Sequence, residues 1–386
     1  MSKPHIMIVA GETSGDLLGA DLMRALCAAQ PDTKFSGVGG PAMSRAGFSS
    51  LFDMSEIAIM GLGPILANLR RLFGLADLTV AHACETQPDI VVLIDSPEFN
   101  HRVAARIKKR FPDVPIVCYV APSVWAWRRG RARKMAAHFD AVLALFPFET
   151  QVFKALSGPP CHFVGHPIIG RVERLGQIPD FRKQHGLGAD IPLLCVLPGS
   201  RMSEIRKIGP AFWETLLRIE RRVEDLAVVI PVLPHTREVV HDMFVGGPFS
   251  PILVEDEGEK WAAFKAANAA LVSSGTATLE LGMAGLPSVV GYRMGKILTA
   301  FVLRSLRVPS AVIVNLVLDK PVMEEFLADR CDPDFLTPAV HKLLVDKDLN
   351  AEKRRQLAAL PEELGAHDAP PDARAAGIIH ELMRQT

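Results

Sequence analysis

The sequence has no excess of charge of either sign. Its 386 residues contain 43 basic and 43 acidic side chains, so the formal net charge is zero. General nucleic-acid-binding proteins are strongly basic, because the neutralisation of phosphate charges supplies most of their affinity. The composition therefore disfavours a nucleic-acid binder and leaves only local basic patches to be explained.

Long apolar runs are also missing. No segment approaches the ~18 to 20 consecutive apolar residues that cross a bilayer. The first apolar run, residues 5–10, is too short for a secretory signal peptide and is followed at once by glycine, charge and hydroxyl groups. With 49% apolar and 22% charged residues, the composition is typical of a soluble globular protein, and the length suffices for two domains. We expect the protein to work in the cytosol, or on a membrane face reached from it.

Metal-binding patterns are absent as well. The six cysteines form no Cys-x-x-Cys pair, and we interpret them as small buried hydrophobes in a reducing compartment. His162 and His166 have the spacing of a helical metal site, but the residues around them predict a strand that runs into a turn. We therefore predict neither a metal nor a cofactor.

The sequence does contain a repeated alternation of short apolar runs and amphipathic segments. Unbroken apolar runs are typical of strands that helices cover on both faces. The first half predicts six strands, and after an irregular stretch, 165–192, the second half predicts five more. The chain after Pro321 is predicted to be helical. We predict an α/β protein with two tandem Rossmann-like domains, 1–170 and 190–386, and an active site in the cleft between them. The predicted strands are 6–9, 35–38, 90–94, 116–120, 141–146, 162–164, 193–197, 228–232, 252–254, 269–272 and 288–291.

The glycine-containing loop after the first strand does not match a dinucleotide fingerprint. Residues 11–15 have the pattern Gly-x-x-x-Gly and not Gly-x-Gly-x-x-Gly, so an enzyme of hydride transfer is disfavoured. The loop still places Glu12, Ser14 and Asp16 at the end of a predicted strand. Ser14 or Asp16 can also serve simply as the cap of the following helix.

Two loops in the second half have the composition of phosphate-binding loops. Strand 193–197 is followed by Pro-Gly-Ser-Arg (198–201), and strand 269–272 is followed by Ser-Ser-Gly-Thr (273–276). A helix N-terminus favours an anion, and Glu280, one turn into the second helix, can accept hydrogen bonds from a ribose. The alternative is that these hydroxyl residues only cap helices. Because the carboxyl ends of parallel strands share one edge of a sheet, the two loops can lie side by side.

Carboxylates also follow a buried strand of the first half. Asp95 ends strand 90–94, and Glu98 comes three residues later. Desolvation at such a position raises the basicity of a carboxylate toward that of a general base. Ser96 or Asn100 can cap the following helix equally well, which leaves Asp95 available for chemistry.

Residues 60–78 place apolar side chains at helical spacing. Such a stripe usually packs on a sheet, but the arginines at 70 and 71 and the bulky Leu/Phe content also suit a helix in a membrane interface. The segment 125–134 joins two tryptophans to five cations. It could contact RNA, but the zero net charge favours a phosphate or an anionic lipid. The spacing alone favours packing on the sheet; if the stripe lies in an interface, as the family resemblance of the whole chain implies, its predicted lipid contacts are Leu62, Ile65, Leu66, Leu69, Leu72 and Phe73.

Taken together, these segments resemble the lipid-A-disaccharide synthase family over nearly the full chain. The segments that carry the resemblance are 10–16, 94–100, 119–128, 146–149, 197–201 and 273–294. The run Pro-Ser-Val-Trp-Ala-Trp at 122–127 is the most specific of them. The short glycine loops alone would not support the identification.

The resemblance implies a metal-free GT-B-type glycosyltransferase, peripheral on the cytoplasmic face of the inner membrane. It implies that UDP-2,3-diacylglucosamine and 2,3-diacylglucosamine 1-phosphate are joined by a β-1,6 bond, with release of UDP. By motif position, Asp95 matches the family's proposed base, Arg201 its donor-phosphate arginine and Asn315 an asparagine near the donor. The predicted catalytic carboxylates are Asp95, Glu98 and Glu12, and the predicted donor site is Ser200, Arg201, Ser274, Gly275, Thr276, Glu280 and Asn315.

Three positions depart from the family pattern. Glu98 replaces the second aspartate of its Asp-x-Pro-Asp motif, Val314 stands where proline usually precedes Asn315, and Ala328 stands where glutamine is usual. The predicted partners are the two substrates and the membrane surface, with a homodimer also considered and no nucleic acid.

Two other functions remain as alternatives. A sugar-nucleotide epimerase of the same architecture would need acid and base groups on both sides of the sugar, and would leave the tryptophan-rich segment without a role. A non-catalytic RNA-binding protein would use Trp125, Trp127 and the neighbouring arginines for stacking and phosphate contacts.

Overall fold

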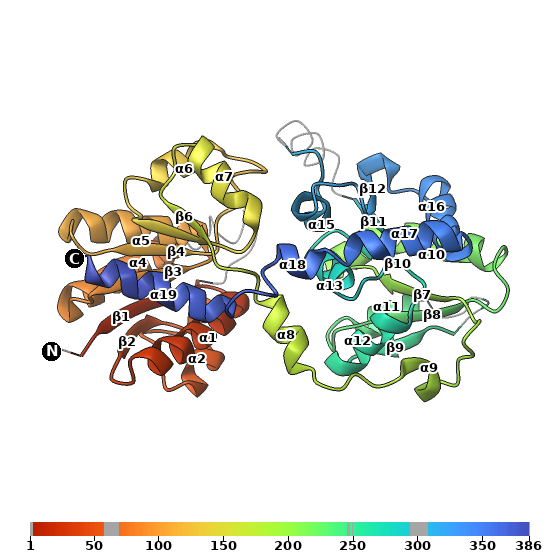
Figure 1. Ribbon diagram of the computed structural model, residues 1–386, viewed down its shortest axis with the longest axis horizontal. Helices are drawn as coiled ribbons and strands as arrows, with labels where there is room; N and C mark the ends of the chain where they lie inside the picture. Colours follow the sequence, from red (N-terminus) through yellow and green to blue (C-terminus); the bar gives the residue numbers. More distant parts are fainter. Residues whose placement is uncertain (1–2, 58–68, 245–247, 249, 294–307, 386) are drawn as a thin grey trace. The chain divides into compact units, whose positions relative to one another are not determined.

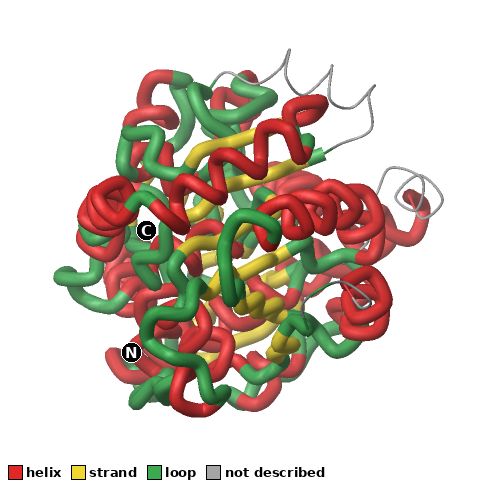
Figure 2. The backbone as a smooth tube through the Cα atoms, turned by 90° about the vertical axis from the view of Figure 1, so that its right-hand side faces the viewer, coloured by secondary structure: helices red, strands yellow, loops and turns green. Residues whose placement is uncertain are grey.

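The computed structural model describes residues 3–57, 69–244, 248, 250–293 and 308–385. The chain divides into two compact units: unit 1 comprises Met1–Pro167 and Leu364–Thr386, and unit 2 comprises Ile168–Glu363. In each unit a parallel six-stranded sheet is covered by helices on both faces (Figures 1 and 2). The predicted α/β class with two tandem Rossmann-like units is confirmed.

The sheet of unit 1 has the strand order β2-β1-β3-β4-β5-β6. The register pairs Ile6 of β1 with Ile90 of β3 and Ala10 with Ile94, and nearly every residue of these two central strands is buried. All six strands predicted for the first half are present. Their bounds are β1 His5–Ala10, β2 Lys34–Val38, β3 Ile90–Ile94, β4 Ile116–Tyr119, β5 Ala141–Ala144 and β6 Cys161–Phe163.

The sheet of unit 2 has the order β12-β11-β10-β7-β8-β9. The five strands predicted for it are present, but the prediction of only helix after Pro321 was wrong, because Glu324–Leu327 forms an edge strand beside β11. An edge strand with two acidic residues lacks the continuous apolar run by which the buried strands were found. The bounds are β7 Leu193–Leu197, β8 Ala227–Pro231, β9 Ile252–Val254, β10 Ala269–Ser273, β11 Ser288–Tyr292 and β12 Glu324–Leu327.

Helices alternate with the strands along both units. In unit 1 they are α1 Thr13–Ala29, α2 Pro41–Arg45, α4 Leu69–Thr86, α5 Pro97–Arg110, α6 Gly130–Met135, α7 Pro147–Ala155 and α19 Pro371–Arg384. In unit 2 they are α8 Ile168–Arg174, α9 Phe181–Gln184, α10 Met202–Glu220, α11 Arg237–Phe244, α12 Glu257–Ala266, α13 Ala277–Met283, α15 Ile313–Val317, α16 Pro333–Val345, α17 Lys347–Leu357 and α18 Leu360–Glu363.

The last helix belongs to unit 1, although the predicted boundary assigned residues 190–386 to a single second domain. Helix α19 packs on α1 and buries Ala375, Ala376 and Ile379. Arg374 at its start donates a hydrogen bond to the carbonyl of Phe163, which ends β6 (2.6 Å). The apolar face of α19 therefore completes the cover of the first sheet.

In each sheet, strand order reverses once. The chain proceeds from β1 outward to β2 and then returns to β3 on the other side, and likewise from β7 outward to β9 and then to β10. Open parallel sheets bind ligands at such switch points, outside the carboxyl ends of the strands. The loops after β1 and β3 in unit 1, and after β7 and β10 in unit 2, are therefore the candidate sites.

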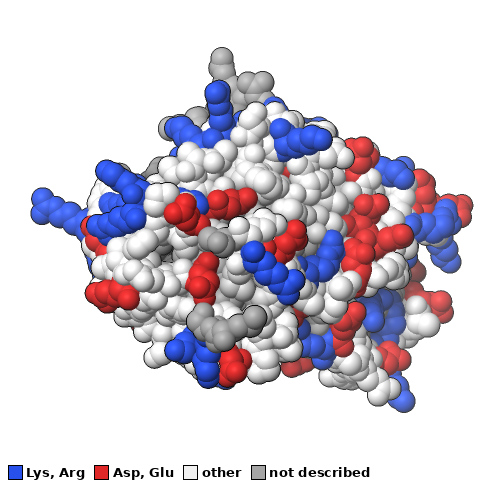
Figure 3. Space-filling view, turned by 60° about the vertical axis from the view of Figure 1, so that its left-hand side comes forward, with Lys and Arg blue, Asp and Glu red and all other residues white. Residues whose placement is uncertain are grey.

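On the face shown in Figure 3, basic and acidic side chains are interleaved.

Candidate active site

The switch point of unit 1 brings together the loops that carry Gly11 and Asp95. A Cβ at Gly11 would collide with Oγ of Ser96, so the close approach of the two loops requires glycine there. Ser14 Oγ lies 3.5 Å from Asp95 Oδ2, and the backbone N–H of Ser96 donates to Asp95 Oδ1 (2.9 Å). The carboxylate of Asp95 is thus held by groups that follow two adjacent strands, β1 and β3.

The backbone at Asp95 is unusual. Asp95 and Ser96 both have positive φ (53° and 41°), a region that non-glycine residues seldom occupy. The Asn100 amide stabilises the turn, because its Nδ2 donates to the carbonyls of Ile94 (3.1 Å) and Asp95 (2.6 Å). Burial raises the pKa of Asp95 above its usual range, against the opposing hydrogen bonds from Ser96 and Ser14. The result is a fixed, half-buried carboxylate of increased basicity.

Glu98 occupies a different environment from Asp95. Its Oε1 accepts a hydrogen bond from Arg128 Nη1 (2.7 Å) and contacts Arg131 Nη2. Partial burial raises the pKa of Glu98, but the hydrogen bond from Arg131 and the two positive charges together hold it below the usual range. Glu12 lies at the N-cap position of α1, at the same edge of the sheet. A carboxylate of lowered pKa is a weaker base, so Asp95 is the better candidate.

Asp16, considered as the cap of its own helix, instead binds the start of α2. It is 2% exposed. Its Oδ1 accepts from the N–H groups of Gly40 (2.8 Å) and Met43 (3.0 Å), and its Oδ2 accepts from Ala42 (2.8 Å). These are the donors that a helix leaves unsatisfied in its first turn. Asp16 therefore has a structural role.

The tryptophan-rich segment is tied to the start of α7 by a buried carboxylate. Trp125 Nε1 donates to Glu149 Oε1 (3.1 Å), and the N–H of Phe146 donates to Glu149 Oε2 (3.1 Å). The rings of Phe146 and His166 stack with centroids 5.3 Å apart, and Trp125 meets Phe148 edge to face. Burial raises the pKa of Glu149 to about 8. The indole of Trp125 is therefore fixed in place by its N–H group.

We expect Glu149→Gln to change how stability depends on pH. The raised pKa means that the stability contributed by the protonated carboxyl is complete below about pH 4.5 and is lost as pH rises through about 8. Glutamine does not titrate, so between these limits the free energy of unfolding should shift in favour of the variant by on the order of a few kcal/mol. Urea unfolding across this pH range measures the shift. A constant difference between variant and wild type would contradict the buried titration.

In unit 2, the predicted donor residues surround one pocket of about 490 Å³. That volume lies within the range of small-molecule sites. Six of the seven predicted donor residues line it. The lining is Arg171, Leu197, Gly199, Ser200, Arg201, Glu204, Pro231, Val232, Leu233, Glu257, Lys260, Ser273, Ser274, Gly275, Thr276, Ala277 and Glu280.

The first wall of this pocket is the turn that leads from β7 into α10. Gly199 has φ +129°, and a Cβ there would lie 2.9 Å from the Cβ of Glu204, so the turn requires glycine. Arg201 is the N-cap residue of α10, and its Nη1 donates to Glu204 Oε1 (3.0 Å). The N-terminus of a long helix and a guanidinium group therefore face the same cavity.

Four further lining residues form an ion-pair network that the sequence did not reveal. Glu280 Oε2 lies 3.2 Å from Lys260 Nζ, and its Oε1 lies 3.2 Å from Arg171 Nη1. Glu257 pairs with the same two cations, at 2.7 Å from Arg171 and 2.9 Å from Lys260. Glu280 thus lines the pocket as predicted, but its oxygens already have cationic partners.

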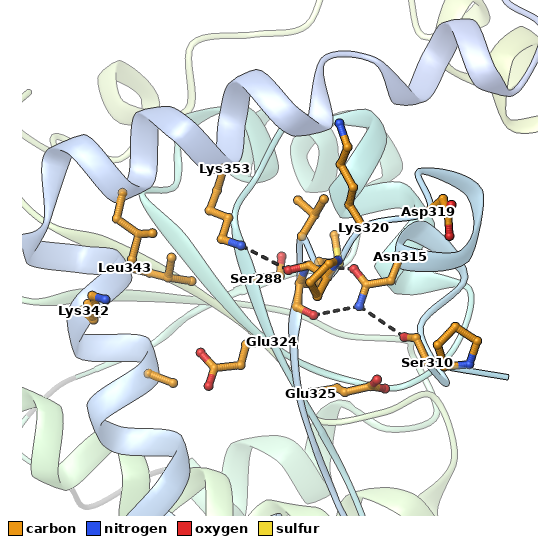
Figure 4. Close-up of a pocket in the computed structure, with 16 residues that line it drawn as sticks. Ser288, Ser310, Asn315, Asp319, Lys320, Glu324, Glu325, Lys342, Leu343 and Lys353 are labelled. Carbon is orange, nitrogen blue, oxygen red and sulfur yellow. Dashed lines mark hydrogen bonds between the residues drawn. The ribbon is translucent and has the colours of Figure 1, made fainter. Parts of the chain in front are cut away.

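Asn315 lies elsewhere. Its Nδ2 donates to Ser310 Oγ (3.2 Å) and to the carbonyl of Met323 (2.8 Å), and its Oδ1 accepts from the N–H of Met323 (2.9 Å) (Figure 4). It lines a second pocket of about 520 Å³, where Ser288 and Glu324 begin β11 and β12. The structure therefore gives Asn315 a role in fixing the 310–323 segment and does not place it with the other predicted donor residues.

The predicted lipid-binding stripe is described only in part. Leu62, Ile65 and Leu66 lie outside the described residues. Leu69 begins α4 and is half-buried, and Leu72 packs partly against the core of unit 1. The exposed apolar side chains of α4 are Phe73 (38%) and Leu78 (45%), with the guanidinium of Arg102 4.5 Å from the Phe73 ring centroid. Within the described residues, no helix combines the length and the apolar character needed to cross a membrane.

Solved structures with this architecture show the class of fold to which the protein belongs. The fold matches the S. aureus MnaA–UDP co-structure (TM-score 0.65, 14% identity, 99% of this chain and 98% of that one). It also matches the calicheamicin glycosyltransferase CalG4 (TM-score 0.62, 16% identity, 100% and 99%). The chain, with two α/β units that each contain a parallel sheet and polar loops at its switch point, thus has a fold of the GT-B type.

Sequence relatives identify the family within that class. The family model described as lipid-A-disaccharide synthetase matches residues 6–370. The lipid-A-disaccharide synthase of Bradyrhizobium diazoefficiens is 40% identical over 99% of this chain and 97% of its own length. That of Rhodospirillum centenum is 42% identical over 98% and 94%. The chain belongs to the lipid-A-disaccharide synthase family, and it is a glycosyltransferase of lipid A biosynthesis.

Proposed function

We propose that the protein joins UDP-2,3-diacylglucosamine to the 6-hydroxyl of 2,3-diacylglucosamine 1-phosphate by a β-1,6 bond and releases UDP. The observation that carries the proposal is the gathering of six predicted donor residues around one pocket at the switch point of unit 2. That pocket offers a helix N-terminus, hydroxyl groups and three cationic side chains, which together suit a nucleoside diphosphate.

Asp95 is the proposed general base. An α-linked donor that gives a β product requires inversion, and therefore a single in-line attack by the acceptor oxygen on the anomeric carbon. In that step the bond from oxygen to the anomeric carbon forms, the bond to UDP breaks, and the hydroxyl proton passes to Asp95. The raised pKa of Asp95 makes it a stronger acceptor of that proton than an exposed aspartate.

The leaving group is the second requirement of the reaction. UDP departs with negative charge on its β-phosphate, and donors aimed at this charge lower the barrier. In the proposal, the negative charge of the departing UDP is stabilised by Arg201, Ser200 and the N-terminus of α10. Lys260, which lines the same pocket, adds a further positive charge. Glu280 is the proposed ribose ligand and keeps Lys260 in place through their ion pair.

Incubation of the protein with the two substrates tests the proposal directly. Mass spectrometry should detect a tetra-acyl disaccharide 1-phosphate together with an equal amount of UDP. Release of UDP without disaccharide would contradict the proposed acceptor. Conversion of the donor alone into an epimer would favour the epimerase alternative.

We also propose that α4 contacts the cytoplasmic face of the inner membrane, because its two exposed apolar side chains, Phe73 and Leu78, suit the boundary between headgroups and acyl chains. Substrates with acyl chains reside in the membrane, so an enzyme whose described helices are not long and apolar enough to cross it needs such a contact. A homodimer stays a prediction that light scattering can test.

Replacing Phe73 and Leu78 with serine should weaken binding to anionic vesicles while lowering the melting temperature by only about 2 to 4 °C, because both side chains are already exposed. Leu72→Ser is the matched control. It removes a side chain that packs on the core, and it should cost about 1 to 3 kcal/mol with vesicle binding unchanged. Vesicle sedimentation and thermal melting separate the two effects. Unchanged sedimentation of the double variant would place the membrane contact elsewhere.

A further inference from the structure

Two arginines of unit 1 converge on a single carboxylate oxygen. Arg128 Nη1 lies 2.7 Å from Glu98 Oε1, and Arg131 Nη2 contacts the same atom. Within the described part of the chain, Glu98 is the acidic side chain with which both arginines pair. One negative charge therefore faces two positive ones, and the cluster has an excess of positive charge.

The two guanidinium groups are held by a well-anchored segment. Arg131 lies in the first turn of α6, where its side chain is only 16% exposed, and the neighbouring Ala132 is fully buried. Arg128 has φ +51°, and its guanidinium lies 4.4 Å from the ring centroid of Trp127. The preceding Trp125 is tied to Glu149. Cations that are fixed before a ligand arrives lose little conformational entropy when they bind it.

The cluster lies at the same edge of the sheet as the proposed base. Glu98 is in the first turn of α5, three residues after Asp95 at the end of β3. The arginines follow β4, which pairs with β3. His101, in the next turn of α5, adds no charge near neutral pH, because burial lowers its pKa to about 4 and the charge of Arg131 acts in the same direction.

The chemistry of this arrangement suits a phosphate group better than a carboxylate. A phosphomonoester has a charge of about −1.5 to −2 at neutral pH and three acceptor oxygens, whereas Glu98 offers one charge. Guanidinium groups match the geometry of phosphate oxygens with paired hydrogen bonds. The Glu98 side chain is 63% exposed, so water screens its ion pairs with the two arginines. A phosphate dianion can therefore readily take the place of the Glu98 carboxylate as their partner.

We propose that Arg128 and Arg131 bind the phosphate of the acceptor sugar, and that Glu98 is a positioning residue that aligns the two guanidinium groups. This inference rests on the proposed function, since it assigns the phosphorylated end of the acceptor to a site beside Asp95. It gives Glu98 a role other than that of a second base. The headgroup of an anionic lipid has the same chemistry, and the experiment distinguishes the two sources.

The test compares two short-chain acceptors, with and without the 1-phosphate, in the absence of vesicles. Wild-type enzyme should prefer the phosphorylated acceptor by about 10- to 100-fold in kcat/KM, the range expected for a hydrogen bond to a charged group. Arg131→Ala and Arg128→Ala should each remove most of that preference and leave kcat/KM for the unphosphorylated acceptor and KM for the donor unchanged. Arg133→Ala, which removes an exposed arginine of the same helix, should keep the wild-type preference.

Two controls keep the result interpretable. Arg128 is exposed, so its variant should fold even if Arg131→Ala does not; thermal melting checks both. Glu98→Gln keeps the shape of the side chain and should keep turnover within about tenfold, whereas loss of a general base costs ~10²- to 10⁴-fold. A loss of that size with both acceptors would overturn the positioning role.

Other outcomes are equally decisive. If the arginine variants lost kcat/KM equally with both acceptors, the arginines would not be recognising the phosphate. Weaker sedimentation of those variants with phosphatidylglycerol vesicles, at an unchanged acceptor preference, would assign the arginines to a lipid headgroup. If wild-type enzyme forms no disaccharide with either acceptor, the proposed function fails, and that result differs from a disaccharide formed without preference.

Discussion

Asp95→Asn should lower kcat by ~10²- to 10⁴-fold, the usual contribution of a positioned general base. The amide has nearly the shape of the carboxylate; its oxygen can accept from the N–H of Ser96 and its NH2 group can donate to the Ser14 hydroxyl, so the left-handed turn and the fold should persist. It cannot accept the proton of the acceptor hydroxyl. Because the proposed UDP pocket is lined by residues of unit 2 alone, the affinity for UDP should be unchanged.

The pH profile provides a second readout for Asp95. Only the ionised carboxylate can act as a base, so activity should be lost as pH falls through the pKa of Asp95, and this limb should lie above the usual range of an aspartate because burial raises that pKa. Asp113→Asn, at an exposed aspartate before β4, is the matched control and should leave both turnover and profile unchanged. Near-normal turnover of Asp95→Asn would move the base to Glu12 or Glu98.

Asp16→Ala should destabilise the protein by about 3 to 5 kcal/mol without acting on the chemistry. The variant leaves the N–H groups of Gly40, Ala42 and Met43 without their acceptor, and a buried donor that loses a charged partner costs ~1 to 3 kcal/mol, with less than full additivity among neighbours. Asp16→Asn should fall between alanine and wild type, because one of its two oxygens is replaced by a donor.

Urea unfolding measures this loss, and calorimetry with UDP provides the control. The fraction of Asp16→Ala that stays folded should bind UDP with wild-type affinity, since Asp16 belongs to unit 1. A variant of normal stability that has lost turnover would show instead that Asp16 takes part in catalysis. The position is instructive because it lies only four residues from Glu12, in the same motif, yet Asp16 is buried whereas Glu12 is only half-buried.

Eleven of the strands could be predicted from the sequence, because buried parallel strands are continuous apolar runs. β12 was not, since its Glu324 and Glu325 lie on an edge strand that has only one neighbour. The phosphate-type loops met as predicted, because residues that follow adjacent parallel strands necessarily share an edge. That rule requires no knowledge of long-range packing, and it explains why Arg201 and the loop at 274–276 line one pocket.

Other parts of the site depend on contacts that spacing does not encode. Arg171 pairs with Glu280 across 109 positions of sequence, and the sole local signal of the network was the i, i+3 spacing of Glu257 and Lys260. Asn315 was assigned by motif position alone, and its amide is bonded to Ser310 and Met323 in the structure. Motif position identifies a residue but not the direction in which its side chain points.

The return of α19 to unit 1 has a consequence for the order in which the protein can fold during synthesis. Unit 2 is one uninterrupted stretch, 168–363, so all of its strands and helices are available before the final helix is made. Unit 1 is begun first but completed last, because α1 must wait for Ala375 and Ile379 to cover it. Domains usually fold in order from the N-terminus as they emerge. Here the later unit can be finished first, and the part of α1 that α19 covers stays exposed to solvent until α19 has been synthesised.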